Sequence, residues 1–419
     1  MNLFDVQVTR KRKPPPPSSP PPMPLPSTSM KGRAPQTSSP PNFKKNNFSL
    51  NLNLPPPGVR PLPDVDIYTK QAHIGQGQYG IVWSGKHKKT QKKVALKAVQ
   101  IRNPNEGYPL TCIREISVLN KLQKNAGEAH SRQGLVKLED LVMKYEGNTP
   151  STLFLVFEFC SYDLYGLLTT REIPLTLTHL KSFAVQLLKA LHFTHSKNIL
   201  HRDLKTANIL VTSGGVLKIA DWGLAREWNG KGRLTVNVVT LWYRAPELIL
   251  GAKTYGKGVD VWSVGCILGE MFRSRGSLFS GHDDSTQINA IFDLLGVPSD
   301  NGWASLEPFS KKFKEFVSSR SERSPASKLQ SFMKGQCSRN VTWVTDKLID
   351  LMQRLLEMDP KKRITAGDAF IHEFFIESPR WVPPNELKMD FRVESVHEYS
   401  SRNRSNSTKA VAAAAAAAK

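Results

Sequence analysis

The spacing of apolar residues changes once along the chain, and this change limits the folds that the chain can adopt. From about Ile67, apolar and polar residues alternate in short runs separated by turn residues, which is typical of strands. The strands are predicted at 68–75, 79–86, 93–101, 135–144 and 152–159, with one helix at 109–122. From about residue 175 to Phe375 the apolar spacing is helical. The sequence therefore predicts an α+β fold in which a small β-rich lobe precedes a larger helical lobe.

Proline and polar residues mark the two ends of this folded part. Of the 29 prolines among 419 residues, 17 lie within residues 1–64, in runs such as Pro14–Pro17 that block regular hydrogen bonding. At the other end the chain becomes polar and rich in Ser and Arg, and it closes with Ala412–Ala418. We therefore expect four parts: a disordered, proline-rich basic tail at 1–64, the small lobe at 65–160, the large lobe at 161–378 and a polar low-complexity tail at 379–419.

The formal net charge is +22, of which +7 falls within residues 1–64. Such a charge favours polyanionic partners or serves solubility alone, and both interpretations stay open. Because no basic stripe is interleaved with aromatic residues, we expect no specific nucleic-acid interface. The basic cluster Arg10–Lys13 is a candidate nuclear import signal.

The cysteines and the apolar runs exclude several classes of protein. The four cysteines are scattered, with no CxxC pair, so neither a disulfide framework nor a zinc module is expected. No apolar run approaches about 18 residues, and the N-terminus lacks an apolar signal-peptide core. We therefore expect an intracellular protein that does not bind membranes.

A glycine-rich segment, Gly75-Gln-Gly77-Gln-Tyr-Gly80, lies between two predicted strands. Alone, this spacing fits a dinucleotide-binding turn, a phosphate-covering loop or an ordinary hairpin. A dinucleotide-binding turn is followed by a helix, whereas a strand follows here. The next strand carries Lys97 in Val94-Ala-Leu-Lys97, and a lysine at this distance is best interpreted as a ligand of the α- and β-phosphates of a nucleotide.

Further motifs follow in a fixed order. They are Ile113-Arg-Glu115, His201-Arg-Asp203-Leu-Lys205-Thr-Ala-Asn208, Asp221-Trp-Gly223 and Ala245-Pro-Glu247. In this order and on these predicted elements, they resemble the signature set of eukaryotic protein kinases. The resemblance covers about residues 66–377 and implies the bilobal protein-kinase fold, with ATP and Mg²⁺ as cofactors.

The resemblance also implies roles for individual residues. Asp203 would orient the attacking hydroxyl and Lys205 would stabilise charge on the transferred group, while Asn208 and Asp221 would hold two Mg²⁺ ions. The nucleotide would contact the glycine-rich segment, the strands on either side of it, and the hinge between the lobes. This implied ATP-binding set comprises Ile74, Gly75, Gln76, Gly77, Gln78, Tyr79, Gly80, Ile81, Val82, Ala95, Lys97, Glu115, Phe157, Glu158, Cys160 and Leu210.

Two segments are similar to those of cyclin-dependent kinases. Pro109–Glu115 resembles the cyclin-contacting helix, and Thr240–Glu247 resembles the segment that binds the substrate. The resemblance implies a cyclin partner on the 109–115 helix, and phosphorylation of Thr235 by an activating kinase or by autophosphorylation. The resulting dianion would be received by three arginines, and a fourth would favour proline after the target Ser or Thr. The three are Arg114, Arg202 and Arg226, and the fourth is Arg244.

Several segments tilt this resemblance toward one branch of the family. Glu106–Thr111, Phe159–Leu168 and Asp368–Phe375 look most like elongation kinases that act on the C-terminal repeats of RNA polymerase II, which implies a nuclear protein, with the cytoplasm as a further compartment. A cell-cycle cyclin-dependent kinase is the alternative. A second alternative is an inactive scaffold, and only Trp222, which replaces the usual Phe, supports it. A third makes the proline-rich tail an adaptor for SH3 or WW domains.

Overall fold

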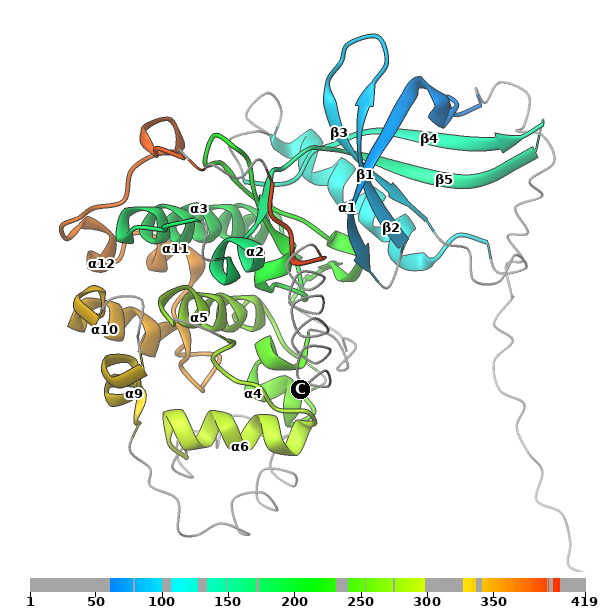
Figure 1. The fold of residues 1–419 in the computed structure, drawn as a ribbon. Coiled ribbons are helices and arrows are strands. Elements are labelled where there is room, and N and C mark those ends of the chain that lie inside the picture. Colours follow the sequence, from blue (N-terminus) through cyan, green and yellow to red (C-terminus); the bar gives the residue numbers. More distant parts are fainter. Residues whose placement is uncertain are drawn as a thin grey trace, which may run out of the picture. The chain divides into compact units, whose positions relative to one another are not determined.

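The computed structural model describes residues 61–77, 80–99, 107–126, 134–147, 149–170, 173–230, 240–252, 254–273, 276–297, 327–336, 341–389, 391 and 395–399. The chain divides into two units, Met1–Ser49 and Leu50–Lys419, and every described residue belongs to the second. Within that unit a sheet-rich lobe precedes a helical lobe (Figure 1), which confirms the α+β, bilobal prediction.

The small lobe is built on one antiparallel sheet. Its spatial order is β1-β2-β3-β5-β4, and helix α1 lies against one face of it (Figure 1). The strands are β1 (Tyr68–Gly77), β2 (Gly80–His87), β3 (Lys93–Ala98), β4 (Leu138–Glu146) and β5 (Thr149–Glu158), preceded by the 3-10 turn η1 (Val65–Ile67), and α1 spans Leu110–Ala126. All five predicted strands and the predicted helix are therefore confirmed, with ends shifted by a few residues.

Alternation along β3 divides its side chains between two faces. Val94, Leu96 and Ala98 are buried in a hydrophobic cluster on one face of the sheet. Because successive side chains point to opposite sides of a strand, Ala95 and Lys97 face the other way, toward the large lobe. One face of β3 therefore belongs to the hydrophobic core, and the other face contributes side chains to the candidate site.

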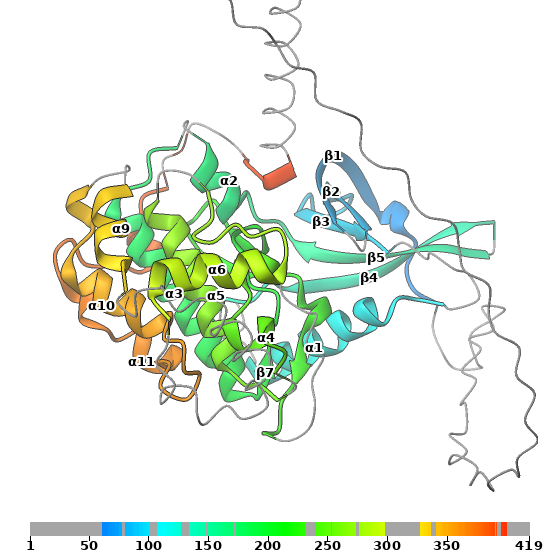
Figure 2. The ribbon, with the colours of Figure 1, turned by 90° about the horizontal axis from the view of Figure 1, so that it is seen from below.

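The large lobe is assembled around α5 (Gly258–Phe272), in which every residue from Val259 to Phe272 is buried. A helix that is apolar on all sides needs neighbours on all sides. Helices α3 (Leu177–Ser196) and α10 (Asp346–Leu355) lie beside it (Figure 2). The other helices of this lobe are α2 (Leu164–Thr169), α4 (Pro246–Ile249), α6 (Asp284–Leu295), α9 (Leu329–Gln336), α11 (Ala366–Ala369) and α12 (Glu373–Ile376).

Short strands hold the loops that lie between the lobes. β8 (Ile209–Val211) pairs with β9 (Leu217–Ile219) and with β6 (Tyr162–Asp163), and β7 (Ile199–Leu200) pairs with β10 (Arg226–Glu227). Asn208 directly precedes β8 and Asp221 follows β9 by two residues, so one small hairpin carries both side chains. The 3-10 turns η4 (Thr206–Asn208), η5 (Trp222–Leu224), η6 (Leu241–Tyr243), η8 (Val341–Trp343) and η9 (Pro384–Glu386) complete the elements.

Part of the predicted C-terminal tail packs against the rest of the chain. Leu387 and Val396 are buried, and Val396 exchanges backbone hydrogen bonds with Ser161 and Asp163, at 3.1 and 3.2 Å. The segment 395–399 therefore lies beside the connection between the two lobes. The described cysteines, Cys112, Cys160 and Cys266, are buried free thiols. Across the described ranges, no helix has both the length and the apolar character that a membrane crossing requires.

Candidate active site

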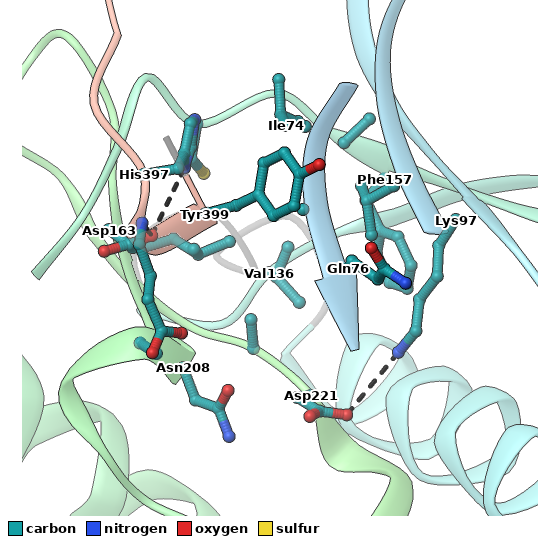
Figure 3. Close-up of a pocket in the computed structure, with 18 of the residues that line it drawn as sticks. Ile74, Gln76, Lys97, Val136, Phe157, Asp163, Asn208, Asp221, His397 and Tyr399 are labelled. Carbon is teal, nitrogen blue, oxygen red and sulfur yellow. Dashed lines mark hydrogen bonds and ion pairs between the residues drawn. The ribbon is translucent and has the colours of Figure 1, made fainter. Parts of the chain in front are cut away.

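A cavity of about 580 Å³ opens between the two lobes (Figure 3). Twelve members of the ATP-binding set that the sequence implied line it: Ile74, Gly75, Gln76, Gly80, Val82, Ala95, Lys97, Glu115, Phe157, Glu158, Cys160 and Leu210. Ile81 does not line it, because alternation along β2 turns this side chain away when Gly80 and Val82 face the cavity. Gly77 ends β1, where it pairs with Gly80. Gln78 and Tyr79 lie outside the described residues.

Three charged side chains meet at the inner end of this cavity. Lys97 Nζ lies 3.0 and 2.8 Å from the two carboxylate oxygens of Glu115 and 3.6 Å from Asp221 Oδ1, the contact that Figure 3 marks. Burial alone would lower the pKa of Lys97, but the two carboxylates raise it above its ordinary value. Burial raises the pKa of Glu115. Burial would also raise the pKa of Asp221, but the charges of Lys97 and Lys205 lower it below its ordinary value. The ammonium group is therefore charged and aimed at the space where a polyphosphate would lie.

Asp203 also lines the cavity and is held by four donors. Its Oδ1 accepts from the backbone N–H and the hydroxyl of Thr240, at 3.1 and 3.0 Å. Its Oδ2 accepts from Lys205 and Asn208, both at 3.2 Å. Four donors saturate the acceptor sites of a carboxylate, so the orientation of Asp203 is fixed.

The loop that carries Asp203 is anchored from below by Asp260 of α5. This fully buried carboxylate accepts hydrogen bonds from the backbone N–H groups of His201 and Arg202, at 2.9 and 2.8 Å, and from His195 Nε2 at 2.9 Å. Burial would raise the pKa of Asp260, but these donors lower it below its usual range. Because α5 lies at the centre of the lobe, these hydrogen bonds fix the position of the loop relative to the hydrophobic core.

Trp222 is accommodated without displacing α1. Its side chain is fully buried, its indole N–H donates to the carbonyl oxygen of Ile219 at 3.1 Å, and it packs edge-to-face on His201 with ring centroids 4.6 Å apart. The ion pair between Lys97 and Glu115 is formed at the same time. The larger side chain is thus compatible with an assembled site.

The three predicted phosphate-receiving arginines surround the segment that follows Asp221. Arg114 donates to the carbonyl oxygen of Gly223 at 2.9 Å, and Arg202 Nε donates to that of Leu224 at 2.9 Å. Arg226 is exposed on β10, and its charge and that of Arg202 both act on Tyr255. The structure therefore brings the three cations to one segment. Thr235 lies outside the described residues.

The segment predicted to bind the substrate, which we call the peptide-binding segment and define as residues 240–245, contacts α6 and the loop that precedes it. Arg244, predicted to favour proline, makes an ion pair of 2.9 Å with Asp284. Trp242 Nε1 donates to the carbonyl oxygen of Gly281 at 2.9 Å. These contacts, with those of Thr240 to Asp203, place the segment beside the candidate catalytic carboxylate.

The contact of Thr240 with Asp203 and the C-terminal residues of the cavity were not predicted from the sequence. His397, Glu398 and Tyr399 line it together with Asp163 (Figure 3). The backbone N–H of Glu398 donates to Asp163 Oδ2 at 2.6 Å, and the ring of Tyr399 lies 4.3 Å from that of His73 in β1. His397 Nε2 is buried without a hydrogen-bond partner in the described structure. No local pattern could have indicated these contacts, because more than 230 residues separate Asp163 from its partner.

Asn208 and Asp221 fit a hard divalent cation. The amide nitrogen of Asn208 donates to the backbone oxygen of Asp203 at 2.8 Å, which leaves its carbonyl oxygen to act as a ligand beside the Asp221 carboxylate. The described residues contain no group of three or more His, Cys, Asp or Glu side chains that could hold a metal ion. Two protein oxygens with further ligands from phosphate and water are the pattern that Mg²⁺ prefers.

Comparisons with known proteins agree with this geometry. Residues 68–375, from the start of β1 into α12, match the protein kinase domain. The chain is 36% identical over 343 residues to cyclin-dependent kinase 9 of Xenopus tropicalis, covering 80% of this chain and 87% of the relative. It is 37% identical over 336 residues to cyclin-dependent kinase 9 of Danio rerio, covering 77% and 83%. It is also 35% identical over 374 residues to cyclin-dependent kinase C-1 of Arabidopsis thaliana, covering 85% and 68%.

Proposed function

Since the chain belongs to the protein kinase family, as a cyclin-dependent kinase of the cyclin-dependent kinase 9 branch, we propose that it phosphorylates Ser or Thr residues followed by proline in the C-terminal repeats of RNA polymerase II. Membership of the family brings serine/threonine kinase activity, the use of ATP with a divalent metal, a cyclin partner and protein substrates. The proline requirement, the polymerase repeats, Mg²⁺ as the metal and a nuclear location are the proposed parts.

The fixed carboxylate of Asp203 carries the proposed mechanism. Asp203 accepts a hydrogen bond from the attacking hydroxyl and orients its oxygen, and the hydroxyl takes the place that Lys205 leaves when it moves to the transferred phosphoryl group. Lys97 binds the α- and β-phosphates, and Asn208 and Asp221 hold the metal. A divalent metal held there would neutralise charge on the phosphates. The residues therefore supply in-line positioning and electrostatic stabilisation.

Substitution of Asp203 tests this mechanism. Asp203→Asn keeps the shape of the side chain but removes the base, so we expect phosphoryl transfer to fall about 10³-fold. The assay is transfer of radiolabelled phosphate by the complex with a cyclin, with the thermal midpoint measured in parallel. An Asn variant that keeps more than a tenth of the activity would remove Asp203 from this role.

Arg244 supports the proline requirement. Its guanidinium pairs with Asp284, and Thr240 of the same segment contacts Asp203, which supports a place for Arg244 near the residue that follows the target hydroxyl. We expect a Tyr-Ser-Pro-Thr-Ser-Pro-Ser repeat peptide to be phosphorylated, and a matched peptide with Ala in place of each Pro to be a poor substrate. Equal rates on the two peptides would contradict the proposal.

A histone-type Ser-Pro-x-Lys peptide separates the branches of the family. Preference for the repeat peptide supports the transcriptional assignment, whereas preference for the histone-type peptide supports a cell-cycle kinase. The inactive-scaffold alternative is not favoured, because Lys97, Asp203 and Asp221 are present and in contact with their expected neighbours. Deletion of residues 1–64 tests the adaptor alternative, and kinase activity that survives the deletion contradicts it as the main function.

The exposed face of α1 supports cyclin binding at the 109–115 helix. Leu110 and Ile113 are 74% and 51% exposed, which is unusual for large apolar side chains on neighbouring turns. A partner that covers them would also fix Glu115, which lies on the same helix and pairs with Lys97. We expect Ile113→Asp to abolish stimulation by cyclin while leaving the thermal midpoint of the isolated chain unchanged.

Activation through Thr235 and import through Arg10–Lys13 complete the proposal. The three arginines near Gly223 support a phosphate-receiving site, so Thr235→Ala should lower the activity of the cyclin complex strongly, whether an activating kinase or the chain itself modifies Thr235. Replacement of the four basic residues by Ala should shift a fluorescent fusion from the nucleus to the cytoplasm. Unchanged nuclear fluorescence would contradict the import signal.

A further inference from the structure

The catalytic loop, which we define as His201–Asn208, and the peptide-binding segment face each other across two hydrogen-bonded contacts. The first joins Asp203 to Thr240, at 3.0 Å between the carboxylate and the hydroxyl. Three residues later in both segments, the hydroxyl oxygens of Thr206 and Tyr243 lie 3.1 Å apart. This second contact does not line the nucleotide cavity, and the mechanism above makes no use of it.

Glu270 of α5 anchors the second contact in the core. The phenol of Tyr243 donates to Glu270 Oε2 at 2.8 Å, and Ser263, also on α5, donates to the backbone oxygen of Tyr243 at 2.9 Å. Thr206, Tyr243 and Glu270 are all buried, with 1%, 5% and 9% exposure. A buried cluster of this kind is costly unless its hydrogen bonds are formed, so its geometry is tightly defined.

The anchored tyrosine controls the residues that a peptide would meet. Tyr243 closes the turn η6 by donating its backbone N–H to the carbonyl oxygen of Thr240 at 2.9 Å, so a shift of Tyr243 moves Thr240. Thr240 contacts Asp203, and Arg244 follows Tyr243 directly. The cluster is therefore connected at one end to the rigid helix and at the other to both sides of the phosphoacceptor position.

We propose that Thr206 and Glu270 are positioning residues that, through Tyr243, set the peptide-binding segment against the catalytic loop. The residues do not touch the nucleotide cavity, so their effect falls on the peptide and not on ATP. The proposal rests on the kinase activity of the chain and is independent of which peptide the enzyme prefers.

The cluster titrates near neutral pH. Burial raises the pKa of Glu270 to about 7; hydrogen bonds from Tyr243 and Thr206 and the charge of Arg273 oppose this rise, and Glu398 adds to it. Burial and the charge of Glu270 raise the pKa of Tyr243, so the phenol stays protonated, as does the buried thiol of Cys266. When Glu270 is ionised, it accepts a charge-assisted hydrogen bond from Tyr243, and protonation weakens that bond. Peptide binding should therefore weaken as pH falls through about 7.

Steady-state kinetics of the full chain in complex with its cyclin test the proposal, on the peptide that the wild type phosphorylates best. We expect Thr206→Ala and Tyr243→Phe each to raise the KM for this peptide about three- to tenfold with an unchanged KM for ATP. In Glu270→Gln, which keeps an acceptor for Tyr243, the KM for the peptide should stay constant between pH 6 and 8. Over the same range the wild type should show an inflection near pH 7.

The controls separate positioning from a loss of folding. Glu373→Gln removes a carboxylate from an exposed ion pair with Lys347 and should match the wild type at every pH. Coinciding pH profiles of wild type and Glu270→Gln would overturn the proposal, as would equal changes in KM for peptide and for ATP in Thr206→Ala. A wild type that prefers peptides without proline would overturn the proposed function and leave this comparison intact, because each variant is compared on the wild type's own substrate.

Discussion

The large lobe and the small lobe each contain a buried ion pair, and the surroundings of the two pairs differ. In the large lobe, Arg363 forms a bidentate pair with Glu247 at 2.7 and 3.0 Å, and both side chains are almost completely buried. Arg363 also donates to three backbone carbonyl oxygens. In the small lobe, Lys97 pairs with Glu115 at 2.8 Å, but the lysine is 16% exposed at the cavity and has Asp221 as a second partner.

The difference separates a contact that maintains the fold from one that can be remade. The guanidinium group of Arg363 is fixed in position, because each of its N–H groups donates a hydrogen bond and water is excluded from its surroundings. The ammonium group of Lys97 joins β3 to α1, whose outer face is exposed, and it lies at the edge of the cavity. We call Arg363–Glu247 the closed pair and Lys97–Glu115 the open pair. The closed pair stabilises the large lobe, whereas the open pair depends on the position of α1 and leaves Lys97 available to phosphate.

Loss of the closed pair should have the largest effect on stability. Arg363→Ala leaves Glu247 buried without its cation, which should lower the free energy of unfolding by about 3–5 kcal/mol. The measurement is denaturant unfolding of the cyclin-free chain. Arg354→Ala, which breaks an exposed pair with Asp350, should change it by less than about 1 kcal/mol. Similar losses in the two variants would erase the distinction between the pairs.

Loss of the open pair should affect catalysis instead. Lys97→Met keeps the aliphatic part of the side chain but removes the ammonium group, so kcat/KM should fall about 10²–10³-fold. The free energy of unfolding should fall by less than in Arg363→Ala, because burial already raises the pKa of Glu115 and its carboxyl group can take up a proton once the lysine is gone. Lys92→Met, which removes the surface pair with Glu139, should leave both quantities unchanged. A large loss of stability in Lys97→Met would make this pair a structural one as well.

A buried carboxylate without a bonded cation should respond to pH. Glu270 is hydrogen-bonded to a phenol where Glu247 has a guanidinium, and burial raises the pKa of Glu270 from 4.5 to about 7. The folded state therefore binds its proton more tightly than the unfolded chain does. The resulting stabilisation is fully present below pH 4.5 and is lost as pH rises through about 7, with a size of about 3 kcal/mol.

Glu270→Gln isolates this contribution, because the amide does not titrate. The difference in unfolding free energy between the variant and the wild type should move in favour of the variant between pH 5 and pH 8. Chemical denaturation at several pH values gives this difference directly. A difference that does not depend on pH would mean that the carboxylate titrates with its ordinary pKa.

The smallest effect on stability and activity is expected for a substitution of Trp222, which follows Asp221 directly in the sequence. Trp222→Phe removes the hydrogen bond to Ile219 and some buried volume, so the free energy of unfolding should fall by about 1–2 kcal/mol. Because the indole donates to Ile219 and packs on His201, the ion pair of Lys97 with Glu115 does not depend on it, and kcat/KM should stay within about threefold. A large rise in activity without cyclin would instead show that the indole holds α1 back.

Most of the fold was predictable from local patterns. Period-two alternation indicated all five strands of the small lobe, and the motif order indicated the kinase fold, which the comparisons support. The strand ends were less accurate, since hydrogen-bond partners decide them. Ile81 was assigned to the site although it faces away from the cavity, because motif membership does not specify which face of a strand a residue occupies.

The site was predictable as a set of residues but not as an arrangement. Lys97, Glu115, Asp203, Asn208 and Asp221 follow from the motifs, because phosphoryl transfer needs these chemical types and they recur at recognisable spacing. The contact of Thr240 with Asp203 was not predicted, because the two residues lie 37 positions apart in the sequence. The segment around His397 was assigned to a tail, since its polar composition carries no record of the backbone that it contacts.

By itself, the sequence of this protein determines the order of its lobes, its family and the chemical groups of its site, because these depend on periodicity and on residue type at short range. Tertiary structure alone decides that Glu247 is almost completely buried while the pair of Glu115 borders the cavity. It also decides that Glu270 accepts a hydrogen bond from Tyr243 and that residues 395–399 reach the cavity. The physical reason is the same in each case. Burial and long-range hydrogen bonds set the charge state and mobility of a side chain, and neither is encoded in its immediate neighbours.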